Sequence, residues 1–481
     1  MPVCDRPLRI LVVSSRDPGG RRTGRKTVIA TIVRSLVGLG HRVDVVALGP
    51  APLAPSPWGD AVPVHRLQPP GPLQIAVNVG RHAIRGRLSL NECLFYSRRL
   101  CAEVAGLADR IGADVVVADM IRTYGLAASA GRPVVLDLDD LLSERYRQTR
   151  GADPDTIVGY FAEYLPAILR RPASVAAARL LSVEAALLRR REAEAASQAA
   201  VTCLVSAEEA DRLSSRIRRA VRWAPMAVPV APFPPAGDAV PGAVFVGGMD
   251  YAPNREAIRW YRDAVLPQLQ AFGAGDVVLD VIGHCPDEVA RTLGSDRIRF
   301  LGYVSDLASA LSGYRIALAP IVSGTGIKTK VLEAMGAGLC VVSTPLGVSG
   351  LPVRSGREAM IGGSAREFAS ALTAILADPD QAAAIGSRAR WMVQAHFSYE
   401  ALQERWSQIL ETVQHLTVQG AAAGAAQLEP VSGLGGSSAQ SVDPPDQAGL
   451  PVGGLVLVDD APGRSLVQAL DRHPQIVDGR L

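Results

Sequence analysis

The chain has 481 residues, of which 48% are hydrophobic, 20% charged and 5% aromatic, and its formal net charge is +3. This length exceeds what one hydrophobic core usually supports, so two domains with additional segments are predicted. The scarcity of aromatic residues and the small net charge argue against a nucleic-acid partner. Six scattered cysteines include no Cys-x-x-Cys pair and no zinc spacing with histidine, which is typical of thiols in a reducing compartment.

The N-terminus shows no signal-peptide pattern, because the apolar run Leu8–Val13 is short and leads into two serines. Uncharged apolar stretches of about 18 residues, as a membrane-spanning helix needs, do not occur in the sequence. These patterns predict a cytoplasmic protein and leave peripheral attachment at the inner membrane face open.

The first half alternates short apolar runs with helical patterns. Leu8–Val13 predicts a buried parallel strand, a glycine-rich loop follows, and Val28–Leu39 has helical periodicity. The long Ala- and Arg-rich segment Tyr146–Ala200 is also helical in pattern. Further buried strands are predicted at residues 113–119, 132–140 and 201–206. This alternation predicts a doubly wound α/β layer.

A second alternation of strands and helices follows a proline-rich segment. Residues 225–241 hold six prolines and little periodicity, which predicts a linker. Beyond it, a helix is expected over Lys328–Met335 and another over residues 380–414, with a break near His396. The predicted organisation is an N-terminal acceptor domain at 1–224, the linker at 225–241, a C-terminal nucleotide-sugar domain at 242–396, a helix crossing back to the N-terminal domain at 397–416, and a mostly disordered tail rich in Gly, Ala, Ser, Pro and Gln at 417–481.

The segment between residues 314 and 347 carries the strongest signal for ligand binding. A buried strand ends there, a loop with Gly324 and Gly326 follows, and a helix opens near Lys328. The start of a helix presents unbonded N–H groups and a partial positive charge, which suit a phosphate, and glycines let the backbone approach it closely. Lys328 and Lys330 lie in or beside the first turn, where cations oppose the helix dipole. An anionic ligand explains their position.

Glu333 lies three residues after Lys330, so the two share one helix face, and the carboxylate leans back toward the helix start. A carboxylate accepts two hydroxyl hydrogen bonds at once, which suits a ribose diol. The alternative is a surface ion pair between Lys330 and Glu333, worth only a few tenths of a kcal/mol. The local pattern leaves both interpretations open.

The sequence VSGTGIKTKVLEAMGAGLCVVSTPLGVSGL, residues 322–351, resembles the donor-site signature of bacterial retaining GT-B glycosyltransferases of family four, also called group one. The likeness covers residues 243–414 strongly and the N-terminal half more weakly. It implies an α/β fold of two Rossmann-like doubly wound domains that face each other across a cleft. The implied reaction moves a hexose from a nucleotide-diphosphate sugar, UDP- or GDP-linked, to a hydroxyl of a polysaccharide, glycolipid or natural product. It also implies retention of configuration, with no metal and no cofactor.

The resemblance implies a role for each matching residue. Lys330, with Lys328 as its rival, would bind the diphosphate, and Glu333 would bind the ribose hydroxyls. The other implied contacts are Gly247 and Gly248 beside the phosphates, Arg255 as a second cation, Gly324, Thr325 and Gly326 in the loop, Val331 and Leu332 near the ribose, and Gly19 and Gly20 facing the sugar and the acceptor.

Two positions depart from the family pattern. Members often carry a second glutamate eight residues before the one at position 333, and Thr325 stands there in this chain. The identity of the donor sugar is therefore open. Many members also have a histidine near the fifth strand of the first domain, where this chain offers Asp119. Asp119 is a candidate on the catalytic side, although a buried carboxylate at a strand end is the favoured interpretation.

The loop GGRRTGRKT, residues 19–27, resembles the phosphate-binding loop of kinases and NTPases. The spacing does not fit, because Arg25 separates Gly24 from Lys26 and Thr27. A kinase or NTPase remains an alternative function. A GT-B module that binds but does not catalyse is the other alternative, supported by the missing glutamate.

Two further patterns have structural interpretations as their default. Asp137-x-Asp139 resembles the metal-binding DxD pair of GT-A enzymes, and a role at a strand end is favoured. The Arg-rich run at residues 179–196 is amphipathic, and a solvated helix face is favoured over transient docking on a membrane surface. The sequence leaves the oligomeric state open.

Overall fold

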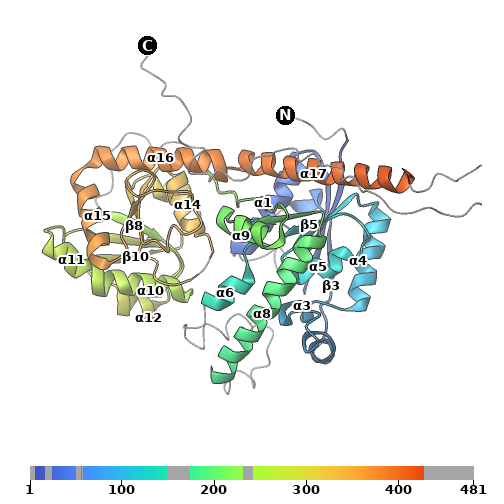
Figure 1. Ribbon diagram of the computed structural model, residues 1–481. Coiled ribbons are helices and arrows are strands. Elements are labelled where there is room, and N and C mark those ends of the chain that lie inside the picture. Colours follow the sequence, from blue (N-terminus) through green and yellow to red (C-terminus); the bar gives the residue numbers. More distant parts are fainter. Residues whose placement is uncertain are drawn as a thin grey trace, which may run out of the picture. The chain divides into compact units, whose positions relative to one another are not determined.

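The structure is a computed structural model that describes residues 6–16, 24–49, 56, 58–148, 174–230, 242–324 and 326–426 (Figure 1). Three predictions fall outside the described residues: the Gly19–Gly20 loop, the position of Thr325, and the disorder of the tail over residues 427–481. Residues 417–426, which the sequence assigned to that tail, instead continue the last helix, so the predicted end of this helix at residue 416 is ten residues too early. Both sheets of the chain belong to one compact unit, Met1–Thr417.

A seven-stranded parallel sheet forms the N-terminal half, in the order β3-β2-β1-β4-β5-β6-β7. Every residue of β4, the run VVVAD, is buried, as expected for a parallel strand with helices on both faces of its sheet. The buried strands predicted in this half are confirmed. The seven strands of this sheet are β1 (Arg9–Ser14), β2 (Arg42–Leu48), β3 (Val64–Leu67), β4 (Val115–Asp119), β5 (Val134–Asp137), β6 (Val201–Leu204) and β7 (Arg222–Trp223).

The helices of this half begin and end where local signals allow. In α4, the Ser97 side chain accepts a hydrogen bond from the Leu100 N–H, and Gly112 ends the helix at φ 61°. The segment predicted as one long helix contains α6 and α8, and residues 149–173 between them lie outside the described residues. The helices are α1 (Gly24–Gly38), α2 (Pro72–Asn78) with its π-helical continuation η2 (Val79–Ala83), α3 (Leu90–Cys93), α4 (Arg98–Ile111), α5 (Ile121–Ala128), α6 (Leu142–Gln148), α8 (Ser174–Gln198), α9 (Ala207–Ile217) and the short 3-10 helix η1 (Gly59–Ala61).

A six-stranded parallel sheet forms the C-terminal half, in the order β10-β9-β8-β11-β12-β13. Two parallel sheets flanked by helices are the doubly wound layers that the sequence predicts. The strands are β8 (Ala243–Val246), β9 (Leu279–Ile282), β10 (Ile298–Gly302), β11 (Ile316–Ala319), β12 (Cys340–Ser343) and β13 (Met360–Ile361).

One predicted helix of this half carries a π-helical turn, η5 (Tyr261–Val265), between α10 and α11. Pro267 lies just after this turn and has no N–H to donate to the carbonyl four residues earlier, so the regular pattern is broken there. The helices are α10 (Ala252–Trp260), α11 (Leu266–Ala271), α12 (Asp287–Leu293), α13 (Leu307–Leu311), α14 (Thr329–Gly336), α15 (Ala365–Ala377), α16 (Pro379–Phe397) and α17 (Tyr399–Ala426). In the ranges that the structure describes, every helix is too short or too polar to cross a lipid bilayer.

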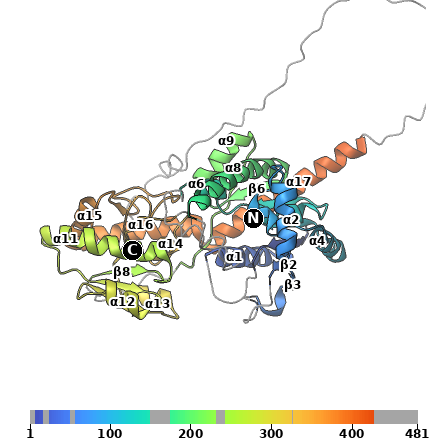
Figure 2. The same cartoon turned by 90° about the horizontal axis from the view of Figure 1, so that it is seen from below.

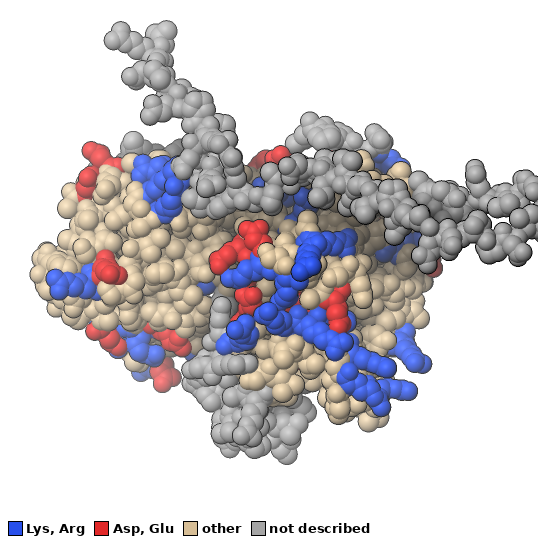
Figure 3. Space-filling model, viewed as in Figure 1, with Lys and Arg blue, Asp and Glu red and all other residues tan. Residues whose placement is uncertain are grey.

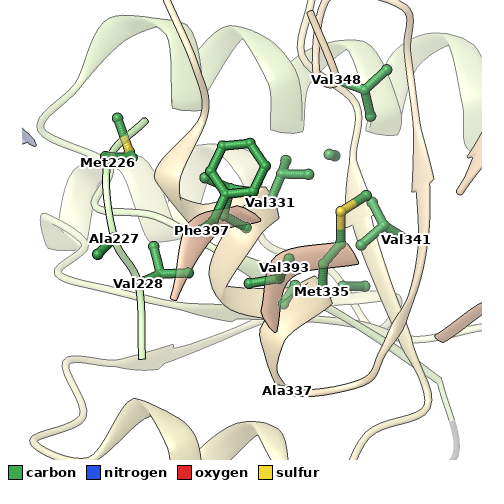
Figure 4. Packing of buried hydrophobic residues seen from close by; sticks show 14 of the residues in the cluster. Met226, Ala227, Val228, Val331, Met335, Ala337, Val341, Val348, Val393 and Phe397 are labelled. Carbon is green, nitrogen blue, oxygen red and sulfur yellow. The ribbon is translucent and has the colours of Figure 1, made fainter. Parts of the chain in front are cut away.

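The first residues of the proline-rich segment pack into the core of the C-terminal half. Met226, Ala227 and Val228 are buried, and Figure 4 shows them beside Phe397 and the α14 residue Val331. The N–H of Val228 donates to the carbonyl of Phe397 at 2.8 Å. This part of the predicted linker is therefore fixed against α14 and α16, whereas residues 231–241 lie outside the described residues.

The last two helices meet at the predicted break, where Ser398 separates α16 from α17. The guanidinium of Arg34 on α1 lies 5.4 Å from the centre of the Tyr399 ring. A side chain at Gly38, the end of α1, would collide with Gln403 of α17. These contacts hold the start of α17 beside α1 (Figure 1).

Candidate functional site

The candidate site lies at the carboxyl edge of the C-terminal sheet, where β8 leads into Gly247 and β11 leads into the loop before α14. Lys328 precedes α14 at the N-cap position and makes no side-chain cap, and no acidic residue stands in the first turn. The N–H groups of Thr329 and Lys330 have no carbonyl one turn earlier in the helix to accept them. The start of α14 can therefore receive an anion.

Lys330 points its ammonium group toward the end of β8. Its Nζ donates a hydrogen bond to Asn254 Oδ1 and lies 4.5 Å from the centre of the Phe245 ring. The pKa of Lys330 is lowered to about 7, mainly by burial and also by the charge of Lys328, while Glu333 acts in the opposite direction. An anion bound here would favour the charged lysine.

Glu333 is half-buried, and no hydrogen bond or ion pair from another described residue reaches its carboxylate. Burial raises its pKa to about 7, and Lys330 lowers it only in part. The alternative interpretation was a surface ion pair between Lys330 and Glu333. This ion pair does not form, because the Lys330 ammonium donates its hydrogen bond to Asn254. The two carboxylate oxygens of Glu333 are thus available to hydroxyl donors.

Lys328 lies in different surroundings from Lys330. Burial lowers its pKa to about 8, the charge of Arg145 acts in the same direction, and Asp140 opposes it. Arg145 pairs with Asp140, and both belong to the segment that begins α6 in the N-terminal half. The ammonium groups of the two lysines have different hydrogen-bond partners: Lys330 donates to Asn254, and Lys328 donates to the carbonyl of Gly326 in the loop before α14.

Gly247 has no side chain, and this allows the Asn254 amide and the Lys330 ammonium to lie close to the end of β8. A Cβ atom at this position would lie 2.6 Å from Asn254 Nδ2 and 2.9 Å from Lys330 Nζ. The same Asn254 Nδ2 donates to the carbonyl of Gly248 at 2.7 Å, so the amide joins the β8 turn to the lysine. In the loop before α14, Gly324 and Gly326 have φ values of 97° and 71°, a region that glycine adopts without strain.

The side chains of three other residues that were predicted to contact the donor do not point to the start of α14. The Arg255 Nη1 donates to the carbonyl of Met249 at 2.6 Å and braces the β8–α10 turn. Val331 and Leu332 are buried and face the hydrophobic core, so only their backbone is near the helix start. Gly19, Gly20 and Thr325 are outside the described residues, and their roles stay predictions.

Arg25 is buried among the carboxylates that end β4 and β5. Its Nε donates to Asp119 Oδ1 at 2.7 Å, and its Nη2 donates to Asp137 Oδ2 at 2.9 Å. Its Nη1 lies 3.0 Å from Asp139 Oδ1. Although desolvation acts against the charged guanidinium, the three aspartates hold the pKa of Arg25 well above its ordinary value. This residue, which looked like part of a phosphate loop, neutralises buried carboxylates.

The aspartates around Arg25 fit structural roles. Asp119 Oδ2 also accepts a hydrogen bond from Ser14 Oγ at 2.8 Å, which matches a buried carboxylate at a strand end. Asp137 and Asp139, the DxD pair, both face the guanidinium. Across the described residues, no group of three or more His, Cys, Asp and Glu side chains is arranged to hold a metal ion.

Sequence reasoning missed Asn254 and Phe245, which position the lysine. A usable signal existed for Asn254, because it lies three and four residues before the buried Ala257 and Ile258 and so shares their helix face. A polar residue on a buried face needs a partner. No comparable signal marks Phe245, which reads as an ordinary strand residue.

Comparisons with known proteins match the part of the chain that forms this site. Residues 240–378 match the family model of the group 1 glycosyl transferases. This segment contains β8, α14 and the loops between them. No curated protein matches the chain.

Solved structures are similar over most of the chain. HepE from Anabaena, in complex with UDP and glucose, has 15% identity and a TM-score of 0.53, with 84% of this chain and 99% of that chain covered. Sucrose-phosphate synthase from Thermosynechococcus elongatus has 17% identity and a TM-score of 0.59, covering 85% and 100%. The fold is GT-B. A TarM variant from S. aureus, in complex with fondaparinux, alpha-GlcNAc-glycerol and UDP, has 10% identity and a TM-score of 0.55, covering 84% and 99%.

The GT-B architecture predicted from the sequence is thereby confirmed. At these identities the likeness concerns the fold alone. Within this GT-B chain, the candidate site lies in the half that the family model matches.

Proposed function

We propose that this chain is a glycosyltransferase that moves a sugar from a nucleotide-diphosphate sugar to an acceptor hydroxyl. The observation that carries the proposal is the start of α14, where uncapped N–H groups, the Lys330 ammonium and the Glu333 carboxylate lie within two helical turns, and no other described residue pairs with that carboxylate. A diphosphate would take the N–H groups and Lys330, and a ribose diol would take Glu333. The group 1 match over this segment supports the assignment.

The same arrangement suits the chemistry of glycosyl transfer. Breaking the bond between the anomeric carbon and the diphosphate places positive charge on the sugar and negative charge on the leaving group. Lys330, Lys328 and the helix N–H groups are fixed donors for that negative charge. Because the protein supplies these charges itself, the proposed reaction needs no metal ion.

The finer features of the proposed reaction follow from the resemblance to family four. They are retention of configuration by a front-face route, in which the departing phosphate accepts the proton of the acceptor, and transfer of a hexose. UDP is a reasonable first nucleotide to test, since HepE has been solved with UDP-glucose and the TarM variant with UDP. The proposed acceptor is a hydroxyl of a polysaccharide, glycolipid or natural product.

A thermal-shift screen with UDP, GDP and their sugars tests the proposal. Ligands that bind the folded chain raise its melting temperature, so at least one nucleotide diphosphate should do so. Hydrolysis or transfer of the sugar from that donor should then be detectable, and Lys330→Ala should abolish both responses. A chain that binds no nucleotide diphosphate would refute the assignment. ATP hydrolysis that is lost in Lys26→Ala would favour the kinase or NTPase alternative.

A binding module without catalysis is the second candidate, and Thr325 is the residue that favours it. The two candidates give different results in the same screen. Binding of a nucleotide sugar without hydrolysis or transfer to any hydroxyl acceptor would favour the binding module.

A further inference from the structure

The helix α2 and its continuation η2 expose apolar side chains on the N-terminal half. Leu73 and Ile84 are each 80% exposed, and Val77 is 46% exposed. The helix instead buries Asn78, whose Nδ2 donates to the carbonyls of Cys93 and Tyr96 at 3.0 Å and 2.6 Å. A surface helix usually turns its apolar residues inward, and this one is reversed. Clustered exposed apolar residues mark interaction sites.

The same segment is strongly basic. Residues 72–88 contain Arg81, His82, Arg85 and Arg87 and no acidic residue. The three arginines are exposed, and none pairs with a carboxylate of any described residue. Burial lowers the pKa of His82, and the surrounding arginines lower it further, as expected for an uncompensated positive region.

Two arginines of α8 are paired with carboxylates. Arg190 pairs with Glu194, and Arg191 pairs with both Glu92 and Glu194. In Figure 3, Lys and Arg side chains gather over the middle and right of the face, with Asp and Glu side chains among them in the middle. Figure 2 shows α2 toward the viewer, on the side that faces down in Figure 1. Arg190 and Arg191 of the Arg-rich run are therefore neutralised by carboxylates, whereas the three arginines of the α2 segment have no carboxylate partner among the described residues.

An anionic lipid surface offers both an apolar layer and negative charge to this segment. Leu73, Val77 and Ile84 can be buried at the boundary of the acyl chains, and the negative headgroups can pair with the arginines. A short helix with apolar residues on one side, arginines beside them and no acidic residue is typical of an interfacial helix. We propose that α2, η2 and the arginines at positions 81, 85 and 87 dock this chain on an anionic lipid bilayer. The proposal does not depend on the function of the nucleotide site.

Vesicle sedimentation with the full-length chain tests it. Vesicles of phosphatidylcholine mixed with phosphatidylglycerol should bind the chain, vesicles of phosphatidylcholine alone should bind it far less, and added salt should weaken binding by screening. Leu73→Gln combined with Ile84→Gln should lower the partition coefficient about tenfold or more. Gln at positions 81, 85 and 87 should lower it to a similar extent on the mixed vesicles.

Matched controls keep the result specific. Leu301→Gln with Tyr303→Gln removes apolar side chains of comparable exposure, 50% and 79%, from the C-terminal half, and should leave binding unchanged. Arg190→Gln removes a paired arginine and should also have little effect. Leu73→Trp adds a reporter that keeps the helix apolar, and its emission should shift to the blue on the mixed vesicles.

Three outcomes would overturn the proposal. The wild-type chain could fail to bind the mixed vesicles, or both Gln variants could bind as well as wild type. Alternatively, the Leu73 and Ile84 substitutions could convert a dimer into a monomer, which would show that a second copy of the chain covers this face.

Discussion

The carboxylate and the ammonium of the candidate site have pKa values that both move toward neutrality. The pKa of Glu333 is raised to about 7, and that of Lys330 is lowered to about 7. Burial penalises both charges, and the lysine gives its hydrogen bond to Asn254 and not to the glutamate. A ligand that carries both an anion and a diol would supply a partner to each group.

Replacing Glu333 by alanine separates a binding role from a structural one. We expect the affinity for UDP to fall about tenfold to a hundredfold, because two hydrogen bonds to a charged group are lost. The melting temperature should stay the same or rise, because an unpaired, half-buried charge is removed. Titration calorimetry and thermal denaturation measure the two quantities. Glu288→Ala, on the surface of α12, is the control. A lower melting temperature with unchanged affinity would indicate a structural ion pair.

The lowered pKa of Lys330 predicts that nucleotide binding depends on pH. Above about pH 7 the unliganded lysine loses its proton, so binding a diphosphate requires proton uptake and the affinity for UDP should decrease by up to about tenfold per pH unit between pH 7 and 9. Lys330→Arg keeps its charge throughout this range and should flatten the profile. Affinities measured by calorimetry in buffers of different ionisation enthalpy would check the proton uptake. A flat wild-type profile would contradict the prediction.

Without ligand, the contributions of Lys330 and Glu333 to the stability of the fold change in opposite directions as the pH rises. Protonation of Lys330 favours the unfolded chain, so its contribution to stability increases as the pH rises from about 7 toward its ordinary 10.5. Ionisation of Glu333 also favours the unfolded chain, so its contribution decreases as the pH rises from 4.5 to about 7. Near pH 7 the burial of the charged lysine and the burial of the charged glutamate both destabilise the fold. A ligand that pairs with both groups should therefore stabilise the fold most at this pH.

Among the elements, α1 is joined to the ends of β4 and β5 by one buried guanidinium. Arg25→Gln would leave three carboxylates, those of Asp119, Asp137 and Asp139, without their cation. We expect a loss of about 3–5 kcal/mol of unfolding free energy. Urea unfolding at pH 7 measures it. Arg42→Gln, at an exposed position of β2, should change stability by less than about 0.5 kcal/mol. An equal effect of both variants would show that the cluster does not stabilise the sheet.

Arg25 also shows where sequence reasoning reached its limit. Its loop matches a phosphate-binding pattern in part, and only the order of the strands reveals that β4 and β5 end beside it. The pairing joins residues more than 90 positions apart, which no local pattern encodes. The segment 322–351 was predictable because its strand end, glycine loop and helix start follow one another along the chain. Asn254, which completes that site, comes from a different element and was missed.

At the scale of the whole molecule, the C-terminal helices connect the two halves. Helix α16 packs against α14 and β12, which carry the candidate site. Helix α17 begins beside α1 and buries Leu402, Trp406, Leu410 and Val413, spaced by three or four residues. The two sheets should therefore unfold together, in one cooperative transition.

Trp406 offers a direct test of this coupling, with a tryptophan of opposite exposure as its control. Trp406 is fully buried, and Trp391 on α16 is 58% exposed. Trp406→Ala should lower the unfolding free energy by about 3–5 kcal/mol, because it leaves a large cavity under α17, whereas Trp391→Ala should change it little. Scanning calorimetry should show one transition in the wild-type chain. In the Trp406 variant, UDP should still shift a transition that reports the C-terminal half, because the substitution lies outside the nucleotide site. If the Trp406 variant is as stable as the Trp391 variant, α17 does not hold the halves together.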